Sequence, residues 1–348
     1  MLKGLTVGEI SLASCSKRWF PIKINKVYVA FYAFLLLIGT TYVMYNRLYG
    51  PLLLPVVFTS RDFVLHNPHL CSGPEDVTLM YIYTSTGAFR TRDAIRRTFG
   101  NHTLLKKYNL RTLFVLGKDH SCDSETIQQH VQTEFSRYRD ILVGDFWDSY
   151  RNLSLKGIVA LDFAHRHCKN ARFVIKADDD VFVNTPALLH DLYNEQQTAK
   201  RTVWGKLITN AKALYCITRA FNKWCILYSH YNRTYYPPYM YGVGFVLTGD
   251  LVSPMLNASE KVLPFPIDDV YMTGLLLEHV KQVKMVDWDK YVAPTPEVAK
   301  EWLDSPQKNK IYFAHSVTPE QILEGWKKLH RPQRQQIEVM PNQQHRGK

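Results

Sequence analysis

Phe173-Val-Ile-Lys-Ala-Asp-Asp-Asp-Val-Phe-Val-Asn184 places three adjacent carboxylates inside an apolar, β-branched stretch. Such a short apolar run predicts a buried strand. An unpaired buried carboxylate is very costly, so three of them at a strand end favour a divalent cation with oxygen ligands. Side chains of an extended backbone alternate between faces, so we expect Asp178 and Asp180 to point one way, as a metal pair, and Asp179 the other. The alternative is a solvated acidic turn between two strands.

Patterns typical of strands and helices alternate on both sides of this run. Strand patterns cover residues 77–83, 112–116 and 173–177. Helical patterns cover residues 92–98, 125–138, 154–167 and 186–196. This alternation predicts an α/β fold with a mostly parallel central sheet and helices on both faces. Ligands of such sheets bind beyond the carboxyl ends of the strands, where the aspartates lie.

The N-terminal region carries the pattern of a membrane anchor. Residues 27–45 have no charge and approach the ~20 residues that a helix needs to cross a bilayer. Five basic residues and one acidic residue precede them, which by the positive-inside rule keeps the N-terminus in the cytoplasm. A cleaved signal peptide is the alternative, but the apolar run is long for one. We therefore expect a cytoplasmic tail (1–26), a single transmembrane signal-anchor (27–45), a luminal stem (46–75), a catalytic domain (76–330) and a polar basic tail (331–348).

The net charge of +12 raises the question of a nucleic-acid partner. Much of the excess flanks the anchor or follows Trp326, and no stripe of Lys and Arg with interleaved aromatic residues marks the body of the chain. We therefore expect no nucleic acid as partner. A basic luminal domain favours anionic substrates such as nucleotide sugars or acidic glycans.

Sequons and cysteines also indicate the secretory pathway. Five of the six cysteines follow the anchor, where disulfides can form, and their spacing matches no zinc pattern. Cys216 and Cys225 are close enough in sequence to close a short loop, although sequence does not fix the pairing. Four Asn-x-Ser/Thr sequons lie on the same side, at Asn101, Asn152, Asn232 and Asn257.

A set of motifs follows one order along the chain. They are Arg92-Asp-Ala-Ile-Arg-Arg-Thr-Phe-Gly100, Asp145-Phe-Trp-Asp-Ser-Tyr-Arg-Asn-Leu-Ser-Leu-Lys156, Lys176-Ala-Asp-Asp-Asp180, Tyr236-Pro-Pro-Tyr-Met-Tyr-Gly-Val-Gly-Phe245, Asp268-Asp-Val-Tyr271, and His315 followed by Pro319 and Trp326. In this order the chain resembles the β-1,3-galactosyltransferase family of Golgi type II membrane enzymes, which includes β-1,3-N-acetylglucosaminyltransferases and is related to Fringe. The resemblance covers residues 77–329. The chain departs from the family pattern at Phe99 (Trp in relatives), Asp268 (Glu) and Met240-Tyr241 (often Cys-Ser).

The resemblance implies a GT-A-like fold and an inverting β-1,3-glycosyltransferase in the Golgi membrane. It implies Mn²⁺ as cofactor, UDP-galactose as donor, and an acceptor glycan on a glycoprotein, glycolipid or proteoglycan. Two alternatives stay open. The donor is UDP-GlcNAc or UDP-GalNAc, or the chain is a catalytically silent relative that acts as a chaperone or binder.

The resemblance also assigns the catalytic and metal residues. It makes Asp269 the general base; the alternative is a carboxylate that stabilises the start of a helix over residues 270–277. Mn²⁺ accepts both carboxylate and imidazole, so Asp178, Asp180 and His315 are the expected metal ligands. A lone histidine beside a strand is otherwise a packed core residue.

Further residues are candidates for binding the donor. Arg92 and Arg96, four positions apart, share a helix face and would fork onto the diphosphate; the alternative is a solvated basic face. Lys176 either pairs with the aspartates or reaches a phosphate. Gly242 and Gly244 allow close backbone approach to a sugar. Asp178 is either a second metal ligand or a contact to the ribose side of the nucleotide, and Asp179 completes the predicted donor contacts. Tyr239 and Tyr241 are candidates for stacking on the sugar; the alternative is ordinary turn and core packing.

Overall fold

The computed structural model describes residues 31–32, 34–41, 44, 62–103, 106–121, 123–215, 223–228 and 230–330 of the chain. The chain divides into two compact units, Met1–Leu53 and Leu54–Lys348. The described residues of the first unit fall within the predicted anchor and are helical. No described helix combines the length and the apolar character needed to span a bilayer. The predicted tails, 1–26 and 331–348, lie outside the described residues.

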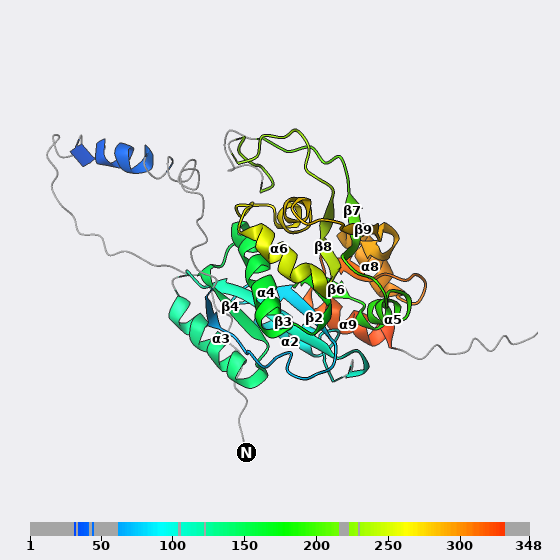
Figure 1. Cartoon of the computed structure of the whole chain (residues 1–348). Helices are drawn as coiled ribbons and strands as arrows, with labels where there is room; N and C mark the ends of the chain where they lie inside the picture. Colours follow the sequence, from blue (N-terminus) through cyan, green and yellow to red (C-terminus); the bar gives the residue numbers. More distant parts are fainter. Residues whose placement is uncertain are drawn as a thin grey trace, which may run out of the picture. The chain divides into compact units, whose positions relative to one another are not determined.

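An eight-stranded sheet forms the middle of the second unit, in the order β1-β4-β3-β2-β5-β8-β7-β9 (Figure 1). The four pairings β2–β3, β3–β4, β2–β5 and β7–β9 are parallel, and the other three are antiparallel. The predicted mostly parallel sheet is therefore confirmed, with β8 running against its neighbours. The strands are β1 (Phe63–Leu65), β2 (Val77–Tyr83), β3 (Leu110–Lys118), β4 (Ile141–Trp147), β5 (Ala171–Asp178), β7 (Thr202–Ile208), β8 (Tyr239–Thr248) and β9 (Lys284–Asp287).

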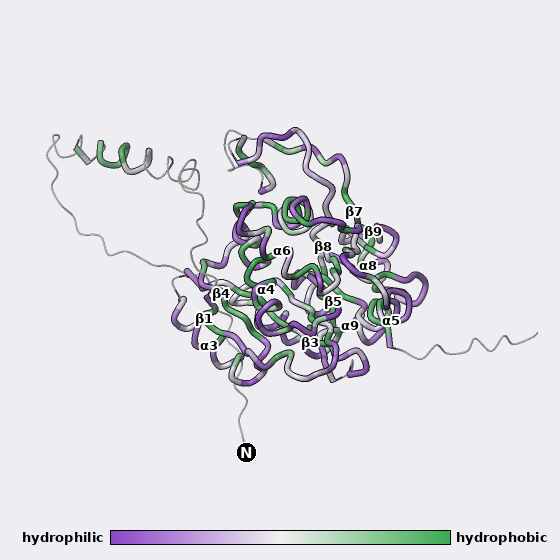
Figure 2. Tube along the Cα trace, viewed as in Figure 1, coloured by the Kyte–Doolittle hydropathy of each residue, from purple (hydrophilic) through white to green (hydrophobic). Residues whose placement is uncertain are grey.

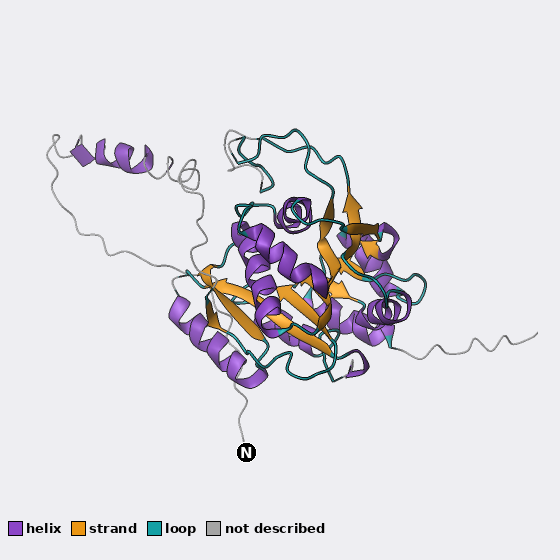
Figure 3. Ribbon diagram, in the orientation of Figure 1, coloured by secondary structure: helices purple, strands orange, loops and turns teal. Residues whose placement is uncertain are grey.

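Helices cover both faces of this sheet, as predicted (Figure 3). The core on one face includes buried residues of α4 and α6, and the core on the other includes those of α2, α3, α5, α8 and α9. Apolar segments concentrate in the strands and in α4 (Figure 2). Because both faces are covered, β2 is buried over its whole length and reads as a continuous apolar run. The helices are α2 (Phe89–Arg96), α3 (Ser124–Tyr138), α4 (Leu153–His167), α5 (Thr185–Glu195), α6 (Val252–Ser259), α8 (Pro296–Asp304) and α9 (Pro319–Leu329).

A second, three-stranded sheet brings the C-terminal part of the chain to the aspartate run. Its order is β10-β11-β6, with β6 at Val181–Val183, β10 at Val292–Ala293 and β11 at Phe313–His315. Strand β11 runs antiparallel to β6, and its register sets His315 opposite Val181. The imidazole is thereby placed next to Asp180, far away in sequence.

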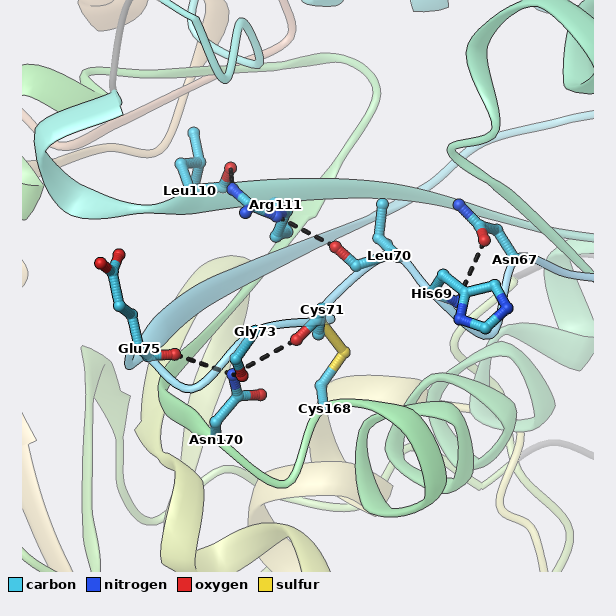
Figure 4. The surroundings of a disulfide bond; sticks show 10 residues. All are labelled: Asn67, His69, Leu70, Cys71, Gly73, Glu75, Leu110, Arg111, Cys168 and Asn170. Atoms are coloured by element: carbon cyan, nitrogen blue, oxygen red, sulfur yellow. Dashed lines mark hydrogen bonds between the residues drawn. A yellow bond between two sulfur atoms is a disulfide. The ribbon is translucent and has the colours of Figure 1, made fainter.

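A disulfide between Cys71 and Cys168 ties the segment before β2 to the end of α4 (Figure 4). Asn170 reinforces this corner, because its side-chain amide donates to the carbonyl oxygens of Cys71, Gly73 and Glu75. Cys225 is also disulfide-bonded. Cys216, its suggested partner, lies outside the described residues.

Candidate active site

A cavity of about 700 Å³ opens where β2 and β5 end. Its walls come from the ends of β2 and β5, the first half of β8, the segment 266–270 and His315. The cavity lies beyond the carboxyl ends of these parallel strands, where the aspartates and a bound ligand are predicted. The lining includes Tyr239, Tyr241 and Gly242, which sequence reasoning placed near a sugar.

The aspartate run bends where it enters this cavity. Strand β5 ends at Asp178, and Asp179 and Asp180 form a turn into β6. All three line the cavity, so the prediction that Asp179 faces away is wrong. Alternation holds only along an extended backbone, and the turn breaks it. The acidic turn weighed as the alternative is present, and it faces the cavity.

Asp180 and His315 face each other across the two sheets' junction. Oδ2 of Asp180 lies 3.5 Å from Nε2 of His315. Nδ1 of His315 lies 3.2 Å from the carbonyl oxygen of Pro294 and 3.3 Å from the hydroxyl oxygen of Ser316; because the carbonyl can only accept, we assign the proton of the neutral ring to Nδ1. The lone pair of Nε2 is then available on the cavity side. The Asp180 carboxylate raises the pKa of His315; burial raises the pKa of Asp180, but His315 more than offsets this and lowers it.

Asp178 takes a different partner. Its Oδ1 lies 2.9 Å from Nζ of Lys176, whose side chain is 1% exposed. Burial raises the pKa of Asp178 to about 6, although Lys176 opposes the shift. Of the alternatives for Lys176, pairing with the aspartates is the one observed. No group of three or more His, Cys, Asp or Glu side chains is arranged to hold a metal within the described part of the chain, so the predicted trio is not assembled.

Asp269 precedes a π-helix, Val270–Leu275, rather than the α-helix expected over residues 270–277. Only Leu276–Glu278 continue as α-helix. π-helical turns occur frequently at functional sites. Oδ1 of Asp269 accepts from the N–H of Val270 at 2.8 Å, and Oδ2 accepts from the N–H of Gly242 at 3.0 Å. Burial and the neighbouring Asp268 raise the pKa of Asp269 to about 7. Asp269 is therefore both a helix-end carboxylate and a cavity-facing group that is poised to accept a proton.

Arg92 and Arg96 do not line the cavity. Arg92 is fully buried, and Nη2 lies 2.7 Å from Glu134. Arg96 pairs with Glu134 at 2.5 Å and with Asp140 at 2.7 Å. This arrangement supports neither the predicted diphosphate contact nor the solvated basic face. Arg92 instead donates to the carbonyl oxygen of Ser85 at 2.6 Å and so supports the loop after β2.

Gly244 also has a packing role. A Cβ at this position would collide with the Phe313 ring of β11, so the close approach that requires glycine is between protein elements. Gly242 differs, because it lines the cavity and a Cβ there would lie 3.2 Å from Oδ2 of Asp269.

A buried polar chain at the other wall received no role from sequence reasoning. Nζ of Lys156 donates to the carbonyl oxygen of Thr84 at 2.6 Å and lies 2.8 Å from Asp148. The hydroxyl of Thr84 donates to Asp179 at 2.6 Å. Asp148 and Lys156 both belong to the Asp145–Lys156 motif, so that motif was the available signal.

Aromatic residues at the rim were also missed. Tyr150 and Trp224 line the cavity, and Nζ of Lys223 lies 4.8 Å from the Tyr150 ring centre and 4.7 Å from that of Trp224. Exposed rings of this kind offer stacking surfaces. The acidic interior and aromatic rim together suit a polar ligand with flat apolar faces.

Comparison with known proteins gives one consistent family. The family model described as galactosyltransferase matches residues 90–288. The chain is 31% identical over 259 residues to beta-1,3-galactosyltransferase 5 of Homo sapiens, covering 74% of this chain and 80% of the relative. It is 29% identical over 272 residues to UDP-GalNAc:beta-1,3-N-acetylgalactosaminyltransferase 1 of Mus musculus, covering 78% and 80%. It is 30% identical over 216 residues to lactosylceramide 1,3-N-acetyl-beta-D-glucosaminyltransferase of Homo sapiens, covering 61% and 56%.

Proposed function

Because this chain belongs to the galactosyltransferase family and is a hexosyltransferase of the β-1,3 type, we propose that it transfers galactose from UDP-galactose to a glycan hydroxyl with inversion. The observation that carries the proposal is the sharing of one cavity by Asp269 and the Asp180–His315 pair. An inverting transfer needs a base for the acceptor hydroxyl and, separately, a means of stabilising the leaving nucleotide. The α/β fold with its mostly parallel sheet suits the GT-A-like architecture that the resemblance implies.

Asp269 is the proposed base. Its pKa near 7 matches the working pH at which general base catalysis is most efficient. The two backbone N–H groups that bind its oxygens fix the orientation of the carboxylate. Each carboxylate oxygen has a further lone pair, which is available to receive the proton of the acceptor hydroxyl.

Mn²⁺ fits the chemistry of the Asp180–His315 pair. The Asp180 carboxylate and the His315 imidazole, with Oδ2 and Nε2 3.5 Å apart, are an oxygen and a nitrogen donor of the kinds that Mn²⁺ accepts and would hold the ion. The Nδ1 contact to Pro294 leaves Nε2 free to ligate. When bound, the ion would neutralise negative charge on the diphosphate leaving group. We leave Asp178 out of this proposed ligand set, because its Oδ1 forms an ion pair with Lys176.

The donor sugar is the part of the proposal with a specific rival. The relatives' names include galactosyl-, N-acetylgalactosaminyl- and N-acetylglucosaminyltransferases, so UDP-GalNAc and UDP-GlcNAc are the alternatives. The test is a panel of UDP-sugars and glycan acceptors with the purified unit Leu54–Lys348 and Mn²⁺. Transfer from UDP-galactose to a β-1,3-linked product supports the proposal, and preference for another UDP-sugar selects the rival. Neither transfer nor hydrolysis of any donor would indicate a silent binder.

We propose a single-pass type II orientation in the Golgi membrane, with the catalytic unit in the lumen. The uncharged stretch 27–45 and the basic residues before it support this orientation. The Cys71–Cys168 disulfide suits an oxidising compartment. Protease added to sealed microsomes should spare the bulk of the chain. Complete digestion in intact vesicles would contradict the orientation.

A further inference from the structure

Lys176 occupies the centre of a buried polar cluster beside the proposed base. Its Nζ donates to the carbonyl oxygen of Gly242 at 2.7 Å, and it lies 2.9 Å from Asp178 and 3.6 Å from Asp268. The same atom lies 4.7 Å from the centre of the Tyr83 ring. A lysine with 1% exposure is rare unless it is paired. Its contacts extend to three segments that are distant in sequence.

The buried polar groups around Lys176 are costly for the folded state. Six buried side-chain polar atoms make no hydrogen bond of good geometry within the described residues, and the two carboxylate oxygens near Lys176 among them have only their ion pairs with it. Four of these six atoms belong to neighbours of Lys176, namely Tyr81, Tyr83, Asp178 and Asp268. Incompletely satisfied buried groups are costly and concentrate where function requires them. Among the described residues, Lys176 is the cation in ion-pair contact with Asp178 and Asp268, so its loss would leave both carboxylates without one there.

Gly242 lies in β8 where neither neighbouring strand supplies it with a register partner. The antiparallel ladder between β5 and β8 ends at Ala177 and Gly244. On the other side, the register between β7 and β8 shifts between Gly205 and Leu207, and Gly242 has no paired residue in either described ladder. Lys176 therefore replaces a strand partner for the carbonyl of Gly242.

The other end of Gly242 contacts the proposed base. Its N–H donates to Oδ2 of Asp269 at 3.0 Å. A continuous set of contacts thus runs from Asp178 through Lys176 and Gly242 to Asp269. It joins the strand end that precedes the proposed metal site to the carboxylate that would deprotonate the acceptor.

We propose that Lys176 is a positioning residue that fixes Gly242, and through it the carboxylate of Asp269, for attack by the acceptor hydroxyl. The inference rests on the proposed transferase function. It places Lys176 in the acceptor half of the reaction, although Lys176 lies two residues before the aspartate run. A displacement of about 1 Å at such a group can cost about 10²-fold in rate.

Lys176→Met tests the proposal, because it keeps most of the side-chain volume and removes the donor and charge. We expect kcat to fall about 10²-fold, while the Kd for UDP in the presence of Mn²⁺ and the KM for the donor stay within about threefold of the parent. A purely structural role would lower the amount of folded protein, and would not lower kcat while leaving donor binding unchanged. Lys310→Met is the matched control: Lys310 also pairs with an aspartate, Asp191 at 2.7 Å, but does not line the cavity, and kcat should stay near the parent's.

Gly242→Ala examines the second link and remains informative if Lys176→Met does not fold. The added Cβ would lie 3.2 Å from Oδ2 of Asp269, which is tight enough to displace the carboxylate without touching the lysine. We expect the same division between kcat and donor binding. Because both changes act on one contact, the kcat of the double variant should be only slightly lower than that of the less active single variant.

The outcomes separate this inference from the proposed function. A parent protein that transfers no sugar refutes the function itself. An active parent with kcat unchanged in Lys176→Met or in Gly242→Ala refutes the positioning role. Donor affinity that falls in parallel with kcat in these variants also refutes it, because Lys176 would then serve the nucleotide.

Discussion

Asp269→Asn is the most direct test of the proposed base. The substitution keeps the size of the side chain and replaces one carboxylate oxygen by an NH₂ group. The carboxylate now accepts from the N–H groups of Gly242 and Val270, and an amide has only one oxygen for these two donors. The local cost is about 1–3 kcal/mol for one unsatisfied buried N–H. The catalytic loss is separate, because an amide does not accept the proton.

General base catalysis contributes about 10²–10⁴-fold, which corresponds to about 2.7–5.4 kcal/mol of activation free energy. We expect kcat of Asp269→Asn to fall by this factor, with the Kd for UDP and Mn²⁺ within about twofold of the parent. The assay is initial-rate transfer at saturating donor, together with UDP binding by calorimetry. Asp268→Asn is the adjacent control and should lose much less activity. If Asp269→Asn keeps most of its kcat while Asp268→Asn loses it, the two roles are reversed; if both stay active, the base lies elsewhere.

The same variant has a stability signature with a definite sign. The folded-state pKa of Asp269 is raised to about 7 from the ordinary 3.8. Between these values the folded state binds more protons than the unfolded state, so this group's contribution to the free energy of unfolding falls as pH rises through that window. Asp269→Asn removes this penalty. The melting temperature of the variant relative to the parent should therefore increase from pH 5 to pH 8. A difference that stays the same over this range would mean that folding does not raise the pKa of Asp269.

Four other results are expected. EDTA should abolish transfer, and Asp180→Asn should weaken Mn²⁺-dependent UDP binding at least tenfold, because it removes a charged oxygen ligand; parent-like binding would exclude Asp180 as a ligand. The value of kcat/KM should decrease as the pH falls below an apparent pKa near 7, because Asp269, which lies beside Asp268, becomes protonated. A profile that is flat from pH 5 to pH 8 would contradict this. Cys71→Ser should lower the free energy of unfolding by about 2–4 kcal/mol by opening a large loop, measured by urea denaturation. Glycopeptide mapping should find a glycan at the exposed Asn232 but not at Asn152, whose side-chain amide already donates to a backbone carbonyl at 2.7 Å.

Local sequence patterns predicted the motifs and many of the strands and helices, but not β4, β6 or the π-helix after Asp269. The predicted strands and helices from residue 77 to residue 196 are all present, with their ends within three residues of those expected. Hydrophobic periodicity is a local property, and it sufficed to place the aspartate run at the carboxyl end of a strand in a mostly parallel sheet. The order of motifs indicated the family that the comparisons then showed.

The partners of the charged residues depend on contacts between segments that are far apart in the sequence. Arg92 was predicted on a diphosphate and is paired with Glu134. Asp178 was predicted on a metal and is paired with Lys176. His315 meets Asp180 only because β11 runs antiparallel to β6. Periodicity shows that a charge is buried but not which opposite charge, brought from a distant strand or helix, offsets its desolvation.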